Sequence, residues 1–381
     1  MKANPDYCFP NSLEDILILE NVKQINPADS RVYYYLGNLW YDKKQYEGAI
    51  GCWENSIKLD SSFPTTYRNL ALAYYNKRHD ALKAQVALEK AFYLQDKDAR
   101  VFLELDQLYK KINVSCAQRL ILFRNNMELV QQRDDLYIEY ITLLNLTGKY
   151  EEAKMLMAAR IFHPWEGGEG KIIKPYVYSH MESGKQHLKN KRYMESLQEL
   201  QQALVYTENL GEGKLLGTQE NDSYYYLGCA YEGMGEKEKA KEHFIKATIG
   251  LSEPINAMFY NDQPPEMIFY QGLALLKLGE IDQGRGRFNK LIDYGKKHLY
   301  DQVSIDYFAV SLPDFLIFDE DLNKKNKIHC HYLMGLGYLG VGNVKTAEEE
   351  FKEVLQMDVS HQGAVTHLSQ VYFAESCLLI F

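Results

Sequence analysis

Several features of metal-binding, secreted and membrane proteins are missing from this sequence. Its six cysteines lie far apart and include no Cys-x-x-Cys pair, so neither a zinc site nor a disulfide framework is indicated. The first residues lack the apolar stretch of a signal peptide. The longest apolar runs, at 16–19 and 377–381, are far shorter than the ~20 residues of a membrane-spanning helix. We therefore expect a cytoplasmic protein with reduced thiols and no membrane contact.

Positive charge and proline are also scarce. Lys and Arg number 43 against 52 Asp and Glu, and the formal net charge of −9 disfavours binding to nucleic acid. Only 10 of the 381 residues are proline, which favours long helices over a loop-rich fold. A single hydrophobic core rarely extends beyond ~250–300 residues. A chain of this length therefore indicates several domains or an extended repeat array.

An internal repeat runs through the whole chain. The segment Tyr35-Leu36-Gly37 recurs as Tyr226-Leu227-Gly228, and related segments contain Gly272 and Gly335. Most of these segments are followed by a polar turn and a second amphipathic stretch with an alanine and a large aromatic residue. This spacing is typical of the tetratricopeptide repeat (TPR), a helix-turn-helix unit of ~34 residues. The sequence thus predicts an all-α fold, a TPR superhelix (α-solenoid) of about eight helix-turn-helix units with long inter-repeat insertions.

Counting back seven residues from the small position of each first helix gives the starts of the repeats. They fall near Ser30, Pro64, Ala99, Asp134, Val177, Asn221, Pro265 and Ile328. About sixteen or seventeen helices are expected from such an array. We divide the chain into an N-terminal segment with a capping helix (1–29), regular repeats with the first insertion (30–176), repeats with long insertions (177–361) and a C-terminal capping helix with a tail (362–381).

The glycines of the repeat predict close contacts between helices. Gly37, Gly228, Gly272 and Gly335 occupy the small position, where we expect no room for a side chain. Leucine in place of Gly228 should overpack this contact and destabilise the protein by about 1–3 kcal/mol.

The repeat spacing lengthens in the second half of the chain, where added residues follow the second helices. The insertions comprise residues 163–171, 208–219, 252–264 and 294–327. Because they occupy one type of junction, we expect them along one edge of the superhelix, with the first two side by side and the turn at 261–265 third. The first two share the tetrapeptide Gly-Glu-Gly-Lys, which lacks the first glycine and the Ser or Thr of a phosphate-binding loop.

These insertions also carry a family resemblance. The strings Phe162-His163-Pro164-Trp165-Glu166-Gly167-Gly168, Tyr260-Asn261-Asp262-Gln263-Pro264 and Asp306-Tyr307-Phe308-Ala309 resemble those of uncharacterised bacterial proteins. In that family a large N-terminal domain of unknown function, β-rich and sugar-enzyme-like, precedes a TPR array. The resemblance covers only the array half, so we expect a fragment or a stand-alone version. It implies no established activity and points only towards carbohydrate metabolism.

Two interpretations apply to the insertion loops. In the first, they form a dock for a partner domain, with Trp165 as an apolar anchor and Lys171 and Lys214 as a charged rim. In the second, Trp165 folds back over the preceding helices and the glycines only form turns. The candidate binding residues of the loops are His163, Trp165, Glu169, Lys171, Glu212, Lys214, Asn261 and Asp262.

The first helices of the repeats form a candidate peptide groove. One TPR subtype binds a partner's C-terminal carboxylate with Lys, Asn, Asn, Lys and Arg at set positions. The matching positions here hold Tyr34, Asn38, Asn69, Arg100 and Glu104. Because Glu104 would repel a carboxylate, we expect a groove for a protein segment instead. Its candidate residues are Tyr34, Asn38, Asn69, Tyr75, Arg100, Tyr225 and Phe269.

No combination of residues indicates catalysis, a metal or a cofactor. His329, Cys330 and His331 are adjacent, but helical neighbours at i and i+2 point to different faces. The carboxylates of Phe318-Asp319-Glu320-Asp321 are interpreted as a solvated loop or a helix start. We predict a non-enzymatic scaffold that binds a protein or peptide partner, with the family's N-terminal domain as one such partner. The alternative is the accessory region of a carbohydrate-active enzyme that helps to shape a sugar site, with the acid and base supplied from elsewhere.

Overall fold

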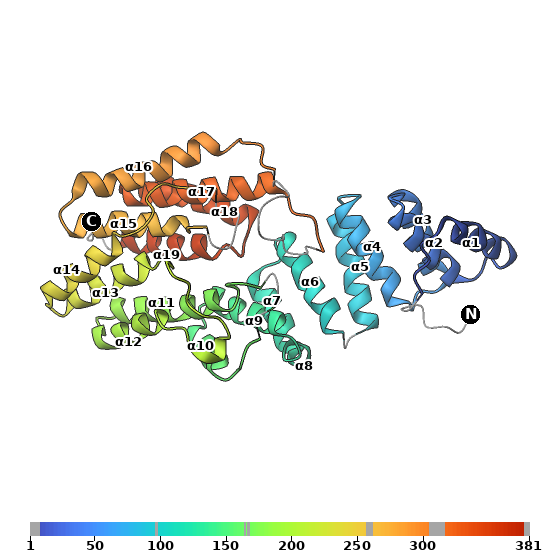
Figure 1. The fold of residues 1–381 in the computed structure, drawn as a ribbon, viewed down its shortest axis with the longest axis horizontal. Coiled ribbons are helices and arrows are strands. Elements are labelled where there is room, and N and C mark those ends of the chain that lie inside the picture. The colour runs from blue at the N-terminus through green and yellow to red at the C-terminus, as the bar shows by residue number, and fades with distance from the viewer. Residues whose placement is uncertain are drawn as a thin grey trace. The chain divides into compact units, whose positions relative to one another are not determined.

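The computed structural model describes residues 8–95, 98–163, 165, 168–256, 262–304 and 317–376, and the regular structure in these ranges is helical (Figure 1). The chain divides into two compact units. Unit 1 comprises the residues up to Ile112 together with the described residues 317–320, which lie much later in the sequence. Unit 2 begins at Asn113 and contains the rest of the chain.

Unit 1 consists of a capping helix, two complete repeats and the first helix of the third repeat. Its helices are α1 (Leu13–Ile25), α2 (Ser30–Asp42), α3 (Tyr46–Leu59), α4 (Pro64–Asn76), α5 (Ala81–Leu94) and α6 (Ala99–Lys111). Local sequence explains several of the starts. Ser12 and Asp15 form a capping box before α1, and Pro64 provides the preset backbone angle of the first turn of α4.

Unit 2 contains the remaining helices, most of which also form the two-helix repeats. They are α7 (Cys116–Asn125), α8 (Met127–Val130), α9 (Asp134–Leu146), α10 (Tyr150–Ala158), α11 (Ile173–Lys189), α12 (Tyr193–Ala203), the 3-10 helix η2 (Glu208–Leu210), α13 (Asn221–Gly233), α14 (Lys237–Ala247), α15 (Pro265–Lys277), α16 (Ile281–His298), α17 (Leu322–Gly340), α18 (Val344–Met357) and α19 (Gln362–Ser376).

The predicted repeat register is confirmed, with two helices longer than expected. Six of the eight first helices begin at the predicted residue, whereas α11 begins at Ile173 and α17 at Leu322 because residues that precede the repeat extend them. The described chain has nineteen α-helices rather than sixteen or seventeen. The excess comes from the capping helix α1 and from α8, which follows a break where the Asn126 side chain donates to the carbonyl of Leu122.

Each repeat turns between its two helices through one residue with a left-handed backbone. These residues are Lys44, His79, Asn113, Gly148, Lys191, Gly235, Gly279 and Gly342, with φ between 53° and 86°. They recur at the same place in all eight units, which fixes the repeat count independently of the side chains. Glycine adopts this conformation without strain, whereas the other four sites bear residues for which it is uncommon.

The small position of the repeat is a close helix crossing, as predicted. A Cβ atom on Gly37 would lie 2.4 Å from the Trp53 indole. An added Cβ atom would lie 2.6 Å from Phe244 at Gly228, 2.4 Å from Phe288 at Gly272 and 2.5 Å from Phe351 at Gly335. Each of these four glycines therefore receives the flat ring of its own repeat's second helix, and the rings are buried at the centre of the repeats.

Helix α19 lies against the first helices of the last four repeats (Figure 1). Thr366 forms a 2.7 Å hydrogen bond with Tyr178 of α11, and the Gln370 amide donates to Tyr226 of α13 at 3.1 Å. At the preceding turn, Arg119 of α7 donates to the hydroxyl of Ser360 at 3.0 Å. The beginning and the end of unit 2 are thus in contact with each other.

Candidate functional site

Residues 317–320 lie as an irregular segment on the C-terminal ends of α4 and α6. Asn76, the last residue of α4, contacts the backbone of this segment with both ends of its amide. Its Nδ2 donates to the carbonyl of Ile317 at 2.8 Å, and its Oδ1 accepts from the amide of Asp319 at 2.9 Å. These two bonds recognise main-chain groups and therefore do not depend on the side chains of the bound segment.

The side chains of the segment have separate contacts. Phe318 is 2% exposed and packs edge-to-face on Tyr75, with 5.2 Å between the ring centroids. The Lys77 ammonium lies 3.5 Å from the Asp319 carboxylate, and the Lys111 ammonium lies 3.4 Å from the Glu320 carboxylate. An aromatic contact is thus followed by two ion pairs along the segment.

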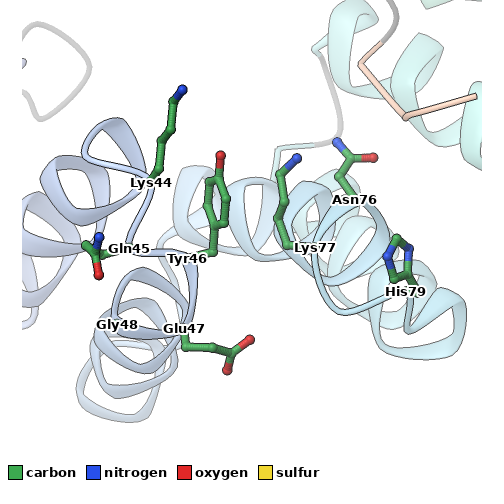
Figure 2. Close-up of a pocket in the computed structure, with 8 residues that line it drawn as sticks. All are labelled: Lys44, Gln45, Tyr46, Glu47, Gly48, Asn76, Lys77 and His79. Atoms are coloured by element: carbon green, nitrogen blue, oxygen red, sulfur yellow. The ribbon is translucent and has the colours of Figure 1, made fainter.

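An open hollow of about 580 Å³ continues from this contact towards the first repeat (Figure 2). Its lining comes from the turn between α2 and α3 and from the turn between α4 and α5, and it includes Asn76 and Lys77. Figure 2 shows Lys44, Tyr46, Lys77 and Asn76 pointing to one side, while Glu47 turns away from them. Glu47 is held by Arg78 at 2.7 Å. The hollow therefore presents cationic and aromatic groups.

The groove residues predicted in unit 1 have different environments and do not line one open surface together. Tyr34 is buried and packs against Phe63, with 4.7 Å between the ring centroids. The Asn38 Oδ1 accepts hydrogen bonds from Trp53 Nε1 and from Asn69 Nδ2, each at 3.1 Å. The side chain of Arg100 is 58% exposed. Of the predicted set, Tyr75 is the residue that contacts the bound segment.

The charge of Glu104 is neutralised within unit 1. Its carboxylate is fully buried and accepts two hydrogen bonds from Arg68, at 2.6 and 2.7 Å. A paired guanidinium removes the repulsion that the sequence predicted for this position. The clamp arrangement is nevertheless not reproduced, because both asparagines of the clamp positions are hydrogen-bonded inside the repeat stack.

The groove residues predicted in unit 2 are covered by its own chain. Phe269 is 2% exposed and lies edge-to-face on His367 of α19, with 5.5 Å between the rings. Tyr225 contacts the rings of Tyr226, Phe244 and Tyr270. Helix α19 thus occupies the face that we interpreted as an extension of the groove.

His367 is the buried polar centre of this covered face. Its Nδ1 contacts the Gly363 carbonyl at 2.7 Å, and because a carbonyl only accepts, Nδ1 carries the proton. Its Nε2 then accepts from the Tyr270 hydroxyl at 3.3 Å. Burial lowers the pKa of His367 to about 3, and the positive charge of Lys185 acts in the same direction. The imidazole is therefore neutral at physiological pH.

The first two insertion loops lie side by side, as predicted. The amide of Phe162 donates to the carbonyl of Asn209 at 2.8 Å. The Asn209 side chain donates in turn to the carbonyls of Met157 and Arg160, at 2.9 Å each. The two Gly-Glu-Gly-Lys strings are in contact, since Glu212 of the second accepts from the amide of Gly170 in the first at 2.9 Å. Burial raises the pKa of Glu212.

The predicted binding residues of the loops have different environments. Trp165 is half-buried, and its indole lies directly against Gly168 of its own loop. His163 is exposed, as are Glu169 and Lys171. Lys214 is paired with Glu220 at 2.5 Å. Asp262 is half-buried, and Asn261 falls outside the described residues.

The other motifs singled out in the sequence have separate structural partners. His329 contacts the carbonyl of Ile255, whereas His331 contacts Glu350. Within the described ranges, no group of three His, Cys, Asp or Glu side chains is arranged to hold a metal ion. No helix in those ranges is long and apolar enough to cross a membrane. Asp321 caps the start of α17, as one interpretation of its motif required.

The sequence did not predict the contacts of Asn76, Lys77 and Lys111 with residues 317–320, nor the burial of Phe318. The carboxylates of 319–321 are predicted to form a solvated loop or a helix start, and no burial is predicted for Phe318 beside them. A weak signal was present, because an aromatic residue stood next to three carboxylates within a long insertion. Nothing in the repeat pattern indicated which surface would receive it.

Comparison with known proteins locates tetratricopeptide repeats in this chain. A TPR repeat model matches residues 37–77, in the first two repeats, and a second tetratricopeptide-repeat model matches residues 222–247, in the sixth. A TPR repeat-containing protein of Methanocaldococcus jannaschii is 23% identical over 423 residues, which cover 90% of this chain and 71% of that protein. Together with the helix pairs and the turns described above, these matches identify the fold as a TPR α-solenoid.

Solved structures with related helical arrangements have low sequence identity. YrrB, a TPR protein with an unusual peptide-binding site, is 18% identical with a TM-score of 0.32, and the match covers 60% of this chain and 89% of that chain. A chain in the structure of Naa15/Naa10 bound to HypK-THB is 9% identical with a TM-score of 0.45, and the match covers 94% of this chain and 63% of that chain.

Proposed function

We propose that this chain is a non-enzymatic protein-interaction scaffold, and that unit 1 binds an extended segment of a partner protein across the C-terminal ends of α4 and α6. The observation that carries the proposal is the pair of hydrogen bonds from Asn76 to the backbone of residues 317–319. An extended peptide presents alternating carbonyl and amide groups, and a single side-chain amide satisfies one of each.

The surface around Asn76 is suited to a ligand that binds and dissociates reversibly. The hollow beside it is open and gives a longer segment room towards the first repeat. Hydrogen bonds link α4, which carries Asn76, to the first repeat through Asn69, Asn38 and Trp53. A support linked in this way, with an open face, reduces the conformational entropy that the protein loses on binding.

The paired insertion loops of unit 2 are a second proposed interaction surface, for a partner domain. They are held together by Asn209 and Glu212, and the apolar side chains of Leu215 and Leu216 are exposed next to them. Trp165 remains the proposed anchor. As the partner we propose the N-terminal domain of the bacterial family that the loops resemble. The alternative is that the loops help to shape a sugar site.

Peptide binding by the full chain, measured by fluorescence polarisation, tests the proposal for unit 1. Because residues 317–319 use the same two hydrogen bonds, the Asn76 variants are compared in a chain that also carries Phe318→Ala/Asp319→Ala, which weakens this internal segment. There Asn76→Ala should abolish binding, and Asn76→Asp should weaken it by at least tenfold because it keeps the acceptor but loses the donor. Asn289→Ala is the matched control, since Asn289 is exposed on α16 and should leave binding unchanged. Equal binding by the Asn76 and Asn289 variants would refute the proposed site.

A further inference from the structure

We infer that the partner segment carries an aromatic residue followed by two acidic residues, and that residues 317–320 are an internal occupant with which this partner competes. The inference rests on the proposed function of unit 1. It specifies the chemistry of the ligand and explains why the free chain would bind a partner with low affinity. Both follow from what residues 317–320 contact.

The aromatic position is specified by burial. Phe318 is 2% exposed although it belongs to a segment without regular structure, and Tyr75 contacts it edge-to-face at 5.2 Å. Edge-to-face contacts between rings add to the free energy gained by burying apolar area. An aliphatic or polar side chain at this position would lose that contact and leave part of the site unfilled.

The acidic positions are specified by two lysines at helix ends. Lys77 follows the last residue of α4 and Lys111 is the last residue of α6, so each stands where unpaired helix carbonyls carry partial negative charge. Without these lysines the helix ends would repel a carboxylate. With them, Asp319 and Glu320 are paired at 3.5 and 3.4 Å. The Lys77 ammonium also lies 5.0 Å from the Tyr46 ring, which orients it beside the hollow.

The internal segment lowers the affinity for any partner that uses the same contacts. A tethered ligand acts at an effective concentration in the millimolar range, so only a fraction of the molecules have a free site at any time. The apparent dissociation constant of an external peptide rises by the inverse of that fraction. Weakening the internal segment should therefore increase the affinity for a partner instead of decreasing it, which a purely structural role of Phe318 does not predict.

The test compares the full chain with its Phe318→Ala/Asp319→Ala variant, in which the internal occupant is weakened. The probe is a fluorescein-labelled peptide, Gly-Ile-Phe-Asp-Glu-Gly, titrated at low and high salt. We expect the variant to bind it at least tenfold more tightly than the unmodified chain, with affinity falling as salt rises. In the variant background, the amide peptide Gly-Ile-Phe-Asn-Gln-Gly should bind at least fivefold more weakly, and Gly-Ile-Ala-Asp-Glu-Gly more weakly still.

A charge exchange provides the matched control for specificity. Lys77→Glu, made in the same variant, should prefer Gly-Ile-Phe-Lys-Glu-Gly over the acidic peptide. Circular dichroism and thermal melting check that each variant is folded. Equal affinities of the unmodified chain and the variant would refute internal competition, and equal affinities for the acidic and amide peptides would refute the acidic preference. Failure of the variant to bind any of these peptides would instead refute the proposed function itself.

Discussion

At the scale of single residues, stability is concentrated where an aromatic ring lies on a glycine. Gly37, Gly228, Gly272 and Gly335 were identified from the sequence because each position recurs with the repeat and pairs with an aromatic residue about sixteen residues later. The structure gives the reason, since the nearest ring atoms leave no room for a methyl group. Here the sequence pattern was sufficient, because both members of each contact belong to one repeat.

The first prediction contrasts two glycines in helices. Gly228→Ala places a Cβ atom 2.6 Å from Phe244, so the ring has to move, and we expect a loss of about 1–3 kcal/mol of unfolding free energy. Gly286→Ala in α16 meets nothing within 4 Å, and alanine's higher helix propensity should stabilise by up to about 1 kcal/mol. Urea unfolding gives both values. Stability changes of the same sign would contradict the packing argument.

The second prediction concerns the buried carboxylate of Glu104. Arg68→Met removes both of its hydrogen bonds and leaves an unpaired charge in the core of unit 1, for which we expect a loss of about 3–5 kcal/mol. The double variant Arg68→Met/Glu104→Met should recover most of this loss, because it removes the charge as well. Additive losses in this double-mutant cycle, measured by urea unfolding, would show that the pair is not coupled.

The pairing of Glu104 was not predictable from the repeat pattern. Arg68 and Glu104 lie in neighbouring repeats, and the pattern fixes which faces meet but not which side chains pair across them. The clamp pattern predicted that Glu104 would repel a ligand carboxylate. That pattern contains no information about Arg68 on the adjacent helix, which neutralises Glu104. A residue from the preceding repeat changes the electrostatics of the site.

At the scale of helices and loops, the sequence predicted the regular parts and the contact between the first two insertions. Helix starts were found to the residue where a proline or a capping side chain marks them, as at Pro64 and Pro265. The extension of α11 and α17 was missed, because residues that precede the repeat and have no equivalent in the other units continue the helix backwards. The neighbouring position of the first two loops followed from stacking alone.

The third prediction tests the link between these two loops. Asn209→Ala removes two hydrogen bonds to the end of α10 and should cost about 1–3 kcal/mol locally. The amides of Phe162 and Gly170, which donate across the two loops, should then exchange hydrogen faster by one to two orders of magnitude. Mass spectrometry of deuterium uptake measures this. Leu216→Ala is the control, since that side chain is fully exposed in the same loop.

At the scale of the whole molecule, each unit has a face that is occupied by a part of the same chain. Residues 317–320 lie on unit 1, and α19 lies on the first helices of the last four repeats in unit 2. Neither was predicted. Periodicity reports contacts between neighbouring repeats, whereas these contacts join residues about 100–240 positions apart and depend on single side chains such as Asn76 and His367.

The closure of unit 2 by α19 should make its stability depend on pH through His367. The pKa of His367 is about 3 in the folded state and close to 6.5 in the unfolded chain. The unfolded state therefore binds the proton first, and unit 2 loses stability as the pH falls below 6.5. Between pH 6.5 and 5 this amounts to about 2 kcal/mol. His361 has a lowered pKa and contributes with the same sign.

Glu266 at the start of α15 acts in the opposite direction. Burial raises its pKa to about 7, and the neighbouring charge of Asp222 adds to the shift. The folded state therefore binds this proton first, and unit 2 gains stability from Glu266 as the pH falls from 7 towards 4.5. In the unmodified chain the two contributions largely cancel, so the pH dependence of the wild type alone does not reveal either group.

The fourth prediction separates these contributions with two neutral substitutions. Urea unfolding at pH 7 and pH 5 gives the change in stability for each variant. His367→Gln should lose less stability on acidification than the unmodified chain, by about 2 kcal/mol, because the unfolded state no longer gains a proton at this site. Glu266→Gln should lose more, by a similar amount, because the folded state no longer gains one. If His367→Gln lost as much stability on acidification as the unmodified chain, the His367 side chain of α19 would not be a buried neutral imidazole, and the closure of unit 2 by that helix would have to be abandoned.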